Sequence, residues 1–105
     1  MNPSVKQITL TGDETSPKFH HAGGAANFAL AGDFGTGSVT LEFNADTSTV
    51  PDADLWVQFR EGTAPLEVTA DYGNTTVPMC SCWVRATSSG GSTSVKFIWS
   101  PVKFL

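Results

Sequence analysis

The sequence predicts an all-β fold: an antiparallel β-sandwich or jelly-roll-like domain of seven to nine short strands. Apolar and polar residues alternate with a period of two, which is typical of strands, and turn-forming Gly, Pro, Asn, Asp and Ser recur every few residues. No window of a dozen residues keeps the i, i+3, i+4, i+7 spacing of an amphipathic helix. Short strands at intervals of about 8–12 residues favour a sandwich or a jelly roll.

Eight segments carry the strand pattern, namely 5–10, 27–31, 39–43, 55–60, 66–70, 77–87, 94–99 and the tail 102–105. In segment 39–43 the apolar odd positions face the core and the polar even positions face outward. The same phase argument predicts a core that includes Leu41, Phe43, Val57, Phe59, Val84, Phe97 and Trp99. Between the strands we expect a loop at 20–26, a turn at 33–37, a polar loop at 44–54, a turn at 72–74 and a hairpin connection at 88–92.

Length and composition limit the class of protein. The 105 residues form a single domain, 1–105, without a linker or an internal repeat. No apolar run approaches the ~18 residues that span a bilayer, and the N-terminus has no apolar core of a secretory signal, so we expect no membrane partner. A net charge of −4 with six Lys and Arg argues against binding nucleic acid, which needs a basic face.

The two cysteines, Cys80 and Cys82, lie on one face of a predicted strand. Their Cα atoms would be roughly 6–7 Å apart, at the upper edge of disulfide geometry. Two thiols without a third ligand make a poor zinc site. We therefore expect reduced, structural cysteines and no cofactor, which fits synthesis in a reducing cytoplasm.

Neither catalysis nor a metal site is well supported by the pattern. His20 and His21 are adjacent, so on an extended chain they point apart; the interpretation is a solvated pair in a loop. Asp46, Asp52 and Asp54 share one polar loop, which is a solvated loop or a cation site, although the spacing does not match a calcium-binding EF-hand. The nucleophile motif G-x-S-x-G is absent. Paired carboxylates for glycoside hydrolysis stay possible, but so small a domain leaves little room for a cleft. The expectation is a protein that is not an enzyme.

Two predicted strands carry large side chains on both faces. Trp56 and Arg60 alternate with the expected core residues of 55–60, and Trp83 and Arg85 alternate with Cys82 and Val84. Trp and Arg are the residues most enriched at binding hot spots. The predicted partner interface therefore comprises Trp56, Arg60, Trp83, Arg85, Phe104 and Leu105. The alternative is that the second sheet, or the loops 11–26 and 44–54, cover the tryptophans.

A family resemblance adds a functional expectation. The run 28–42 (FALAGDFGTGSVTLE), followed by Trp56-Val57, Val84-Arg85-Ala86 and a glycine-rich connection before the last strand, resembles small β-sandwich virion proteins of tailed bacteriophages over residues 27–99. The resemblance implies a non-enzymatic virion protein, such as a capsid decoration (cement) protein. It would be made in the host cytoplasm and assembled with itself, often as a homotrimer, and with other virion proteins. The alternative is a carbohydrate- or receptor-binding module, for which a glycan is a possible partner.

Overall fold

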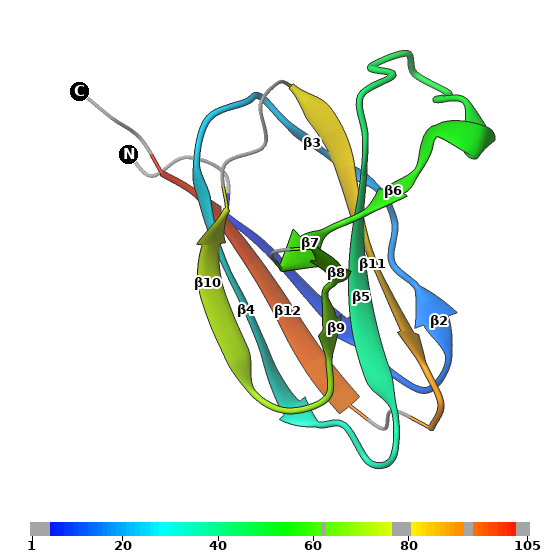
Figure 1. The fold of residues 1–105 in the computed structure, drawn as a ribbon, viewed down its shortest axis with the longest axis vertical. Coiled ribbons are helices and arrows are strands. Elements are labelled where there is room, and N and C mark those ends of the chain that lie inside the picture. Colours follow the sequence, from blue (N-terminus) through cyan, green and yellow to red (C-terminus); the bar gives the residue numbers. More distant parts are fainter. Residues whose placement is uncertain (1–4, 62, 77–80, 92–93, 103–105) are drawn as a thin grey trace.

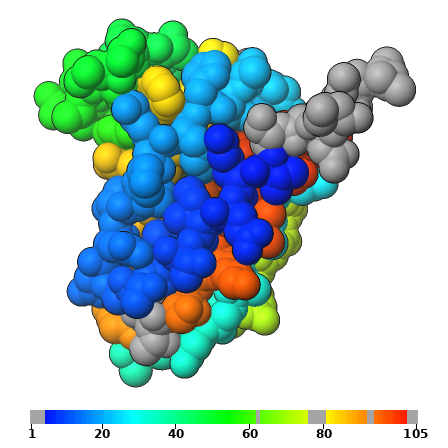
Figure 2. Space-filling view, turned by 180° about the vertical axis from the view of Figure 1, so that it is seen from behind, coloured from blue at the N-terminus to red at the C-terminus, as the bar shows by residue number. Residues whose placement is uncertain are grey.

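The first sheet contains four long antiparallel strands. The computed structural model describes residues 5–61, 63–76, 81–91 and 94–102. The strands of this sheet are β1 (Lys6–Leu10), β4 (Ala26–Asp33), β10 (Tyr72–Thr76) and β12 (Ser94–Pro101). Their order across the sheet is β1-β12-β4-β10, so β1 and β10 are its edges (Figure 1). Figure 2 shows β1 and the segment that follows it on the rear of the molecule.

The second sheet has two long central strands and interrupted edges. Its centre is β11 (Cys82–Ser89) paired with β5 (Ser38–Asn44). On one side, β2 (Glu14–Thr15) and β3 (Phe19–His21) pair with successive parts of β11; on the other, β6 (Val57–Gln58) and β9 (Glu67–Val68) pair with successive parts of β5. Between β6 and β9 the chain forms a small hairpin, β7 (Arg60–Glu61) and β8 (Ala64–Pro65). A single turn of 3-10 helix, η1 (Ala53–Leu55), precedes β6.

The connectivity is that of an eight-row jelly roll. When β2 and β3 are counted as one row, and β6 and β9 as another, the described chain has four rows in each sheet. When the rows are numbered one to eight along the chain, their order across the first sheet is 1-8-3-6, and their order across the second sheet is 2-7-4-5. This is the double-sheet arrangement in which every connection crosses between the sheets except the one from the fourth row to the fifth. The predicted all-β sandwich is confirmed. The described residues form twelve strand segments because two edge rows are each interrupted and the β7–β8 hairpin adds two more.

An aromatic cluster centred on Trp99 fills the space between the sheets. The rings of Phe19, Phe28, Phe59 and Phe97 have their centroids 5.9–6.2 Å from that of Trp99. Five of the seven predicted core residues are buried, namely Leu41, Phe59, Val84, Phe97 and Trp99. Phe43 is partly buried and packs against the core.

The prediction that Val57 is a core residue is wrong, because its side chain is 48% exposed. Val57 pairs with Phe43 and so faces the same side of the sheet, which means that the predicted phase is right. The burial fails because β6 is the edge row of its sheet, at a place where Phe43 itself is only partly covered. The expected strand 55–60 is also divided: η1 ends at Leu55, which is 51% exposed, and the chain leaves the sheet after Phe59.

Several expected connections differ from the structure. The expected turn at 72–74 belongs to strand β10, which pairs with β4. The connection 88–92 is not a hairpin within one sheet, since β11 and β12 belong to opposite sheets; residues 92–93 lie outside the described residues. The expected turn at 33–37 is confirmed: Gly35 has φ 58°, and the amide of Gly37 donates to the carbonyl of Phe34 at 2.9 Å.

The predicted strand pieces at 77–80 and 103–105 lie outside the described residues. Of the expected C-terminal strand 102–105, only Val102 is described, and its amide donates to the carbonyl of Ala25 at 2.9 Å. Within the described ranges, no helix is long and apolar enough to cross a membrane.

Candidate binding surfaces

Three of the predicted interface residues meet on the outer face of the second sheet. Arg85 on β11 lies directly across from Glu42 on β5, and its Nε is 2.8 Å from Oε1 of Glu42. The guanidinium carbon of Arg85 lies 3.9 Å from the ring centroid of Trp56, within cation–π range. The side chains of Arg85 and Glu42 are 29% and 25% exposed, so their ion pair is partly shielded from water. Trp56 and Arg85 thus form one rigid polar-aromatic unit.

Trp83 lies on the same outer face, but its own chain covers part of it. The indole nitrogen of Trp83 donates to the carbonyl of Ser48 at 2.9 Å. The His20 ring packs edge-on against the Trp83 ring with 5.5 Å between the centroids, and the Lys18 ammonium lies 4.7 Å from the Trp83 ring centroid. Both Trp56 and Trp83 are intermediate in exposure. The predicted outward phase is therefore right, and the alternative of cover by the loops holds in part. That these residues bind a partner stays a prediction.

The loop 45–56 that touches Trp83 is held by its own polar side chains. The Asp46 carboxylate accepts the amides of Ser48 at 3.1 Å and Asp52 at 2.8 Å, as well as the Ser48 hydroxyl at 2.5 Å. These bonds, led by the Ser48 hydroxyl, hold the pKa of Asp46 below its usual value of 3.8. Buried Asn44 ties the loop to β5: its side-chain amide donates to the Asp52 carbonyl at 2.9 Å, and its side-chain oxygen accepts the Asp46 amide at 2.9 Å.

The acidic side chains of this loop act mainly as caps for backbone amides. Besides the bonds of Asp46, the Asp52 carboxylate accepts the amide of Asp54 at 2.9 Å, at the start of η1. Over the described ranges, no group of three or more His, Cys, Asp or Glu side chains is placed to hold a metal ion.

The same loop exposes apolar side chains. Val50 is 83% exposed, Leu55 51% and Val57 48%, so the segment 50–57 supplies three of the five large hydrophobic residues exposed in the described chain. Figure 1 shows the loop extending beyond the upper end of β5. In the opposite view, Figure 2 shows it as a lobe that stands out from the body.

Arg60 does not join Trp56, Trp83 and Arg85. Strand β7 leaves the second sheet, and Nη1 of Arg60 donates to the carbonyl of Thr63 at 2.9 Å. Arg60 instead lines a pocket of about 210 Å³ at the β10 edge of the sandwich. The other described residues that line it are Phe28, Phe59, Glu61, Leu66, Tyr72, Asn74 and Thr75.

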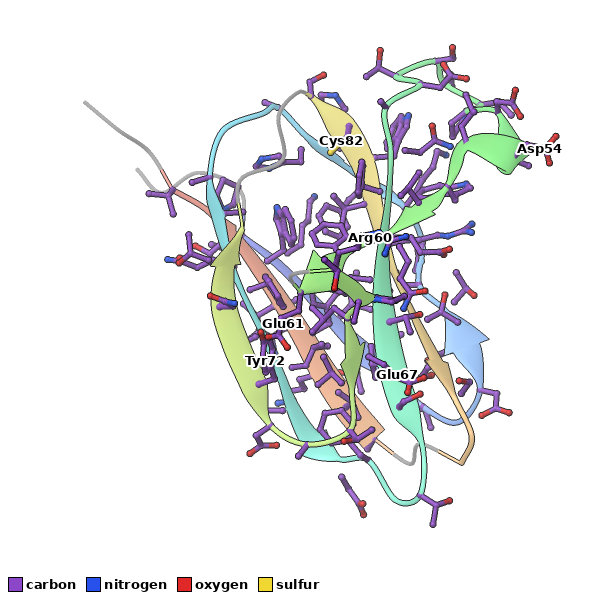
Figure 3. All side chains as sticks on the ribbon, viewed as in Figure 1. Asp54, Arg60, Glu61, Glu67, Tyr72 and Cys82 are labelled. Atoms are coloured by element: carbon purple, nitrogen blue, oxygen red, sulfur yellow. The ribbon has the colours of Figure 1, made fainter. Side chains whose placement is uncertain are left out.

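The polar side chains of this pocket come from two elements. The Tyr72 hydroxyl donates to Oε2 of Glu61 at 2.5 Å, and the Asn74 amide donates to the Tyr72 oxygen at 3.1 Å. The bond to Glu61 stabilises the protonated phenol and so raises the pKa of Tyr72 above 10.0. Figure 3 shows Glu61 and Tyr72 close together between β7 and β10. The sequence did not predict this pocket, because Gly73-Asn74 is typical of a turn and residues 72–74 were therefore not assigned to a strand.

The two histidines have separate structural roles, which corrects the expectation of a solvated loop pair. Both lie on β3, where His20 is exposed and His21 is only 1% exposed. Nε2 of His21 is 2.9 Å from the carbonyl of Gly24, and Trp99 donates its indole N–H to Nδ1 of His21 at 3.2 Å. Because a carbonyl only accepts, Nε2 carries the proton and Nδ1 accepts, which fixes the neutral tautomer.

Of the two cysteines and the predicted C-terminal interface residues, only Cys82 lies within the described residues. Cys82 is fully buried on β11, whereas Cys80, Phe104 and Leu105 lie outside the described residues. The expectation of reduced cysteines stays a prediction. No family model matches the sequence, and no curated protein or solved structure matches it significantly. Function must therefore be argued from the chain's own surfaces.

Proposed function

We propose that this chain is a non-enzymatic structural protein of a particle, an accessory or decoration component of a tailed-phage virion, that associates with itself and with other particle proteins. The observation that carries the proposal is the exposure of Val50 and Leu55 in the loop that leads to Trp56, with Val57 exposed just beyond it. Clustered exposed hydrophobic residues mark interaction sites. The jelly-roll topology agrees with this role by analogy only, since capsid and lectin domains both use it.

The rigidity of the loop supports binding rather than accidental exposure. Asn44, Asp46 and Asp52 fix the backbone that carries Val50 and Leu55 through side chain–backbone hydrogen bonds. A loop that is already ordered loses little conformational entropy when a partner covers it. Its exposed apolar side chains then gain the full benefit of burial, roughly 25 cal/mol per Å².

The outer face next to the loop provides the polar part of such an interface. The Arg85 guanidinium is already held by Glu42 and by the Trp56 ring, so its geometry does not have to be selected on binding. An aromatic and arginine centre beside apolar residues is the composition of interface hot spots. A second copy of the chain is the partner we propose for this surface, with a homotrimer as the expected assembly.

Sedimentation velocity on the purified chain tests the proposal. We expect a trimer for the wild type and a folded monomer for Leu55→Ser, because Leu55 is exposed and its replacement removes no core contact. Ile98→Ser is the matched control: Ile98 is 36% exposed on β12 of the other sheet, so this variant should remain a trimer. Trp83→Ser should also weaken assembly, but it removes the bond to Ser48 as well, so its fold must be checked by circular dichroism.

A wild type that stays monomeric at high concentration contradicts the proposal. An assembly that Leu55→Ser leaves intact contradicts the placement of the interface.

A further inference from the structure

The inner face of edge strand β10 carries polar side chains where the fold would otherwise place core residues. Tyr72 pairs with Leu30 and Asn74 pairs with Phe28, and directly paired residues of antiparallel strands point to the same side. Leu30 and Phe28 are buried between the sheets. Tyr72 and Asn74 therefore lie on the side of β10 that faces the second sheet, at the rim of the pocket that the β7–β8 hairpin borders; Tyr72 is partly buried and Asn74 is exposed.

The pocket combines an apolar floor with a polar rim. Phe28 and Phe59, whose rings meet edge-on at 6.4 Å, are 5% and 6% exposed and supply the floor together with Leu66. Glu61, Tyr72 and Asn74 supply the rim. The hydrogen bonds that join these three residues use Oε2 of Glu61 and one amide N–H of Asn74. The second carboxylate oxygen, the second amide N–H and a lone pair of the phenol can still meet a ligand.

We propose that this pocket binds a single sugar residue, with its hydroxyls on Glu61, Tyr72 and Asn74 and an apolar C–H face toward Phe28 and Phe59. A sugar hydroxyl both donates and accepts, so it suits a rim in which acceptors and donors alternate. The volume of about 210 Å³ is below the ~300–1,000 Å³ of sites for drug-sized ligands and suits one ring. Arg60 and Glu61 both line the pocket, so their opposite charges balance and favour a neutral ligand over an anion such as a phosphate.

This site is distinct from the proposed assembly surface. It lies between the β10 edge of the first sheet and the β7–β8 hairpin, and none of Val50, Leu55 and Val57 lines it. The sugar is a neutral hexose or N-acetylhexosamine, free or at the end of a longer glycan. A particle protein with such a site would add recognition of a glycan to its structural role.

Heteronuclear NMR with free monosaccharides tests the inference directly. We titrate the folded chain with glucose, galactose, mannose and N-acetylglucosamine and follow the amide signals of residues 59–61 and 72–75. At least one sugar is expected to shift these signals at millimolar concentration. Asn74→Ala removes a hydrogen-bonding side chain from the site, and Glu61→Gln replaces a charged acceptor by a weaker neutral one, so each should weaken that binding about tenfold.

Glu67→Gln is the matched control for Glu61→Gln. Glu67 is exposed on β9 and does not line the pocket, and Figure 3 shows it well apart from Glu61 and Tyr72. This variant should bind the sugar as the wild type does. Sugar shifts that are equal in wild type, Asn74→Ala and Glu61→Gln would overturn the inference.

Two further outcomes also overturn the inference. In the first, none of the four sugars shifts the amide signals of the wild type but free lysine does, which would mean that the pocket binds a cation. In the second, no sugar binds and Asn74→Ala self-associates, which would mean that the polar residues only protect the edge strand from pairing.

Discussion

The buried bond between Trp99 and His21 should be among the strongest single polar contributions to the stability of this fold. Replacing His21 by Leu leaves the indole N–H of Trp99 without an acceptor in a site where the Trp99 side chain is 1% exposed. An unsatisfied buried donor costs about 1–3 kcal/mol. The substitution also removes an edge-on ring contact at 5.3 Å, which contributes about 0.5–1.5 kcal/mol. The carbonyl of Gly24 loses its donor at little cost, because Gly24 is exposed and can bind water.

The expected loss of unfolding free energy for His21→Leu is therefore about 2–4 kcal/mol. Urea denaturation followed by tryptophan fluorescence measures it: at an m-value of about 2 kcal/mol/M, the midpoint falls by about 1–2 M. His20→Leu is the matched control on the same strand, and because His20 is exposed its effect should stay within about 1 kcal/mol. The double variant His21→Leu/Trp99→Phe should lose less unfolding free energy than the sum of the two single variants, since both partners of the bond are then gone.

If His21→Leu changes the midpoint no more than His20→Leu does, the buried bond contributes nothing and this reasoning is refuted.

Three further predictions follow from the core, the backbone and the pocket. Phe97→Ala, at a fully buried site, should cost about 3–5 kcal/mol in urea denaturation, against about 1 kcal/mol or less for Ile98→Ala at the neighbouring site, which is 36% exposed. Gly32→Ala should destabilise strongly in the same assay, because Gly32 has φ +139° and a Cβ there would lie 2.4 Å from a carbonyl oxygen of β12; a neutral effect would mean that the close approach is wrong. Tyr72 is the only tyrosine, so its ultraviolet titration should give a midpoint above 10.0 that Glu61→Gln lowers. Because the folded chain holds this proton more tightly than the unfolded chain, the stabilisation is present below pH 10 and is lost as the pH rises through the folded-state pKa; an unshifted midpoint contradicts the bond to Glu61.

Period-two alternation predicted the long central strands well and the edges poorly. In β5, β11 and β12 a strand on each side fixes the register, so the apolar phase and the burial agree at Leu41, Val84 and Phe97. At the edge, the phase of Val57 was right but its burial was not, because burial depends on what the facing sheet covers and not on the strand's own pattern. The jelly-roll order itself depends on pairings between distant strands that no local pattern records.

The candidate sites show the same division. The outward phase of Trp56, Trp83 and Arg85 follows from local alternation, and the structure places all three on one face. Arg60 has the same phase in the sequence, yet it leaves the sheet with the β7–β8 hairpin, which forms mainly from residues between the predicted strands 55–60 and 66–70. The pocket at Tyr72 needed the pairing of β10 with β4, a contact across some 45 residues of chain.

The two proposals concern different residues, so one set of variants separates them. Leu55→Ser should abolish assembly and leave sugar binding unchanged, because Leu55 does not line the pocket. Asn74→Ala should weaken sugar binding and leave the trimer intact, since Asn74 lines the pocket and is not part of the proposed interface. If Leu55→Ser also weakens sugar binding, the glycan site requires the assembled form. If Asn74→Ala also dissociates the trimer, the β10 edge belongs to the interface between copies, and the polar rim of the pocket would then be part of that contact rather than an independent site.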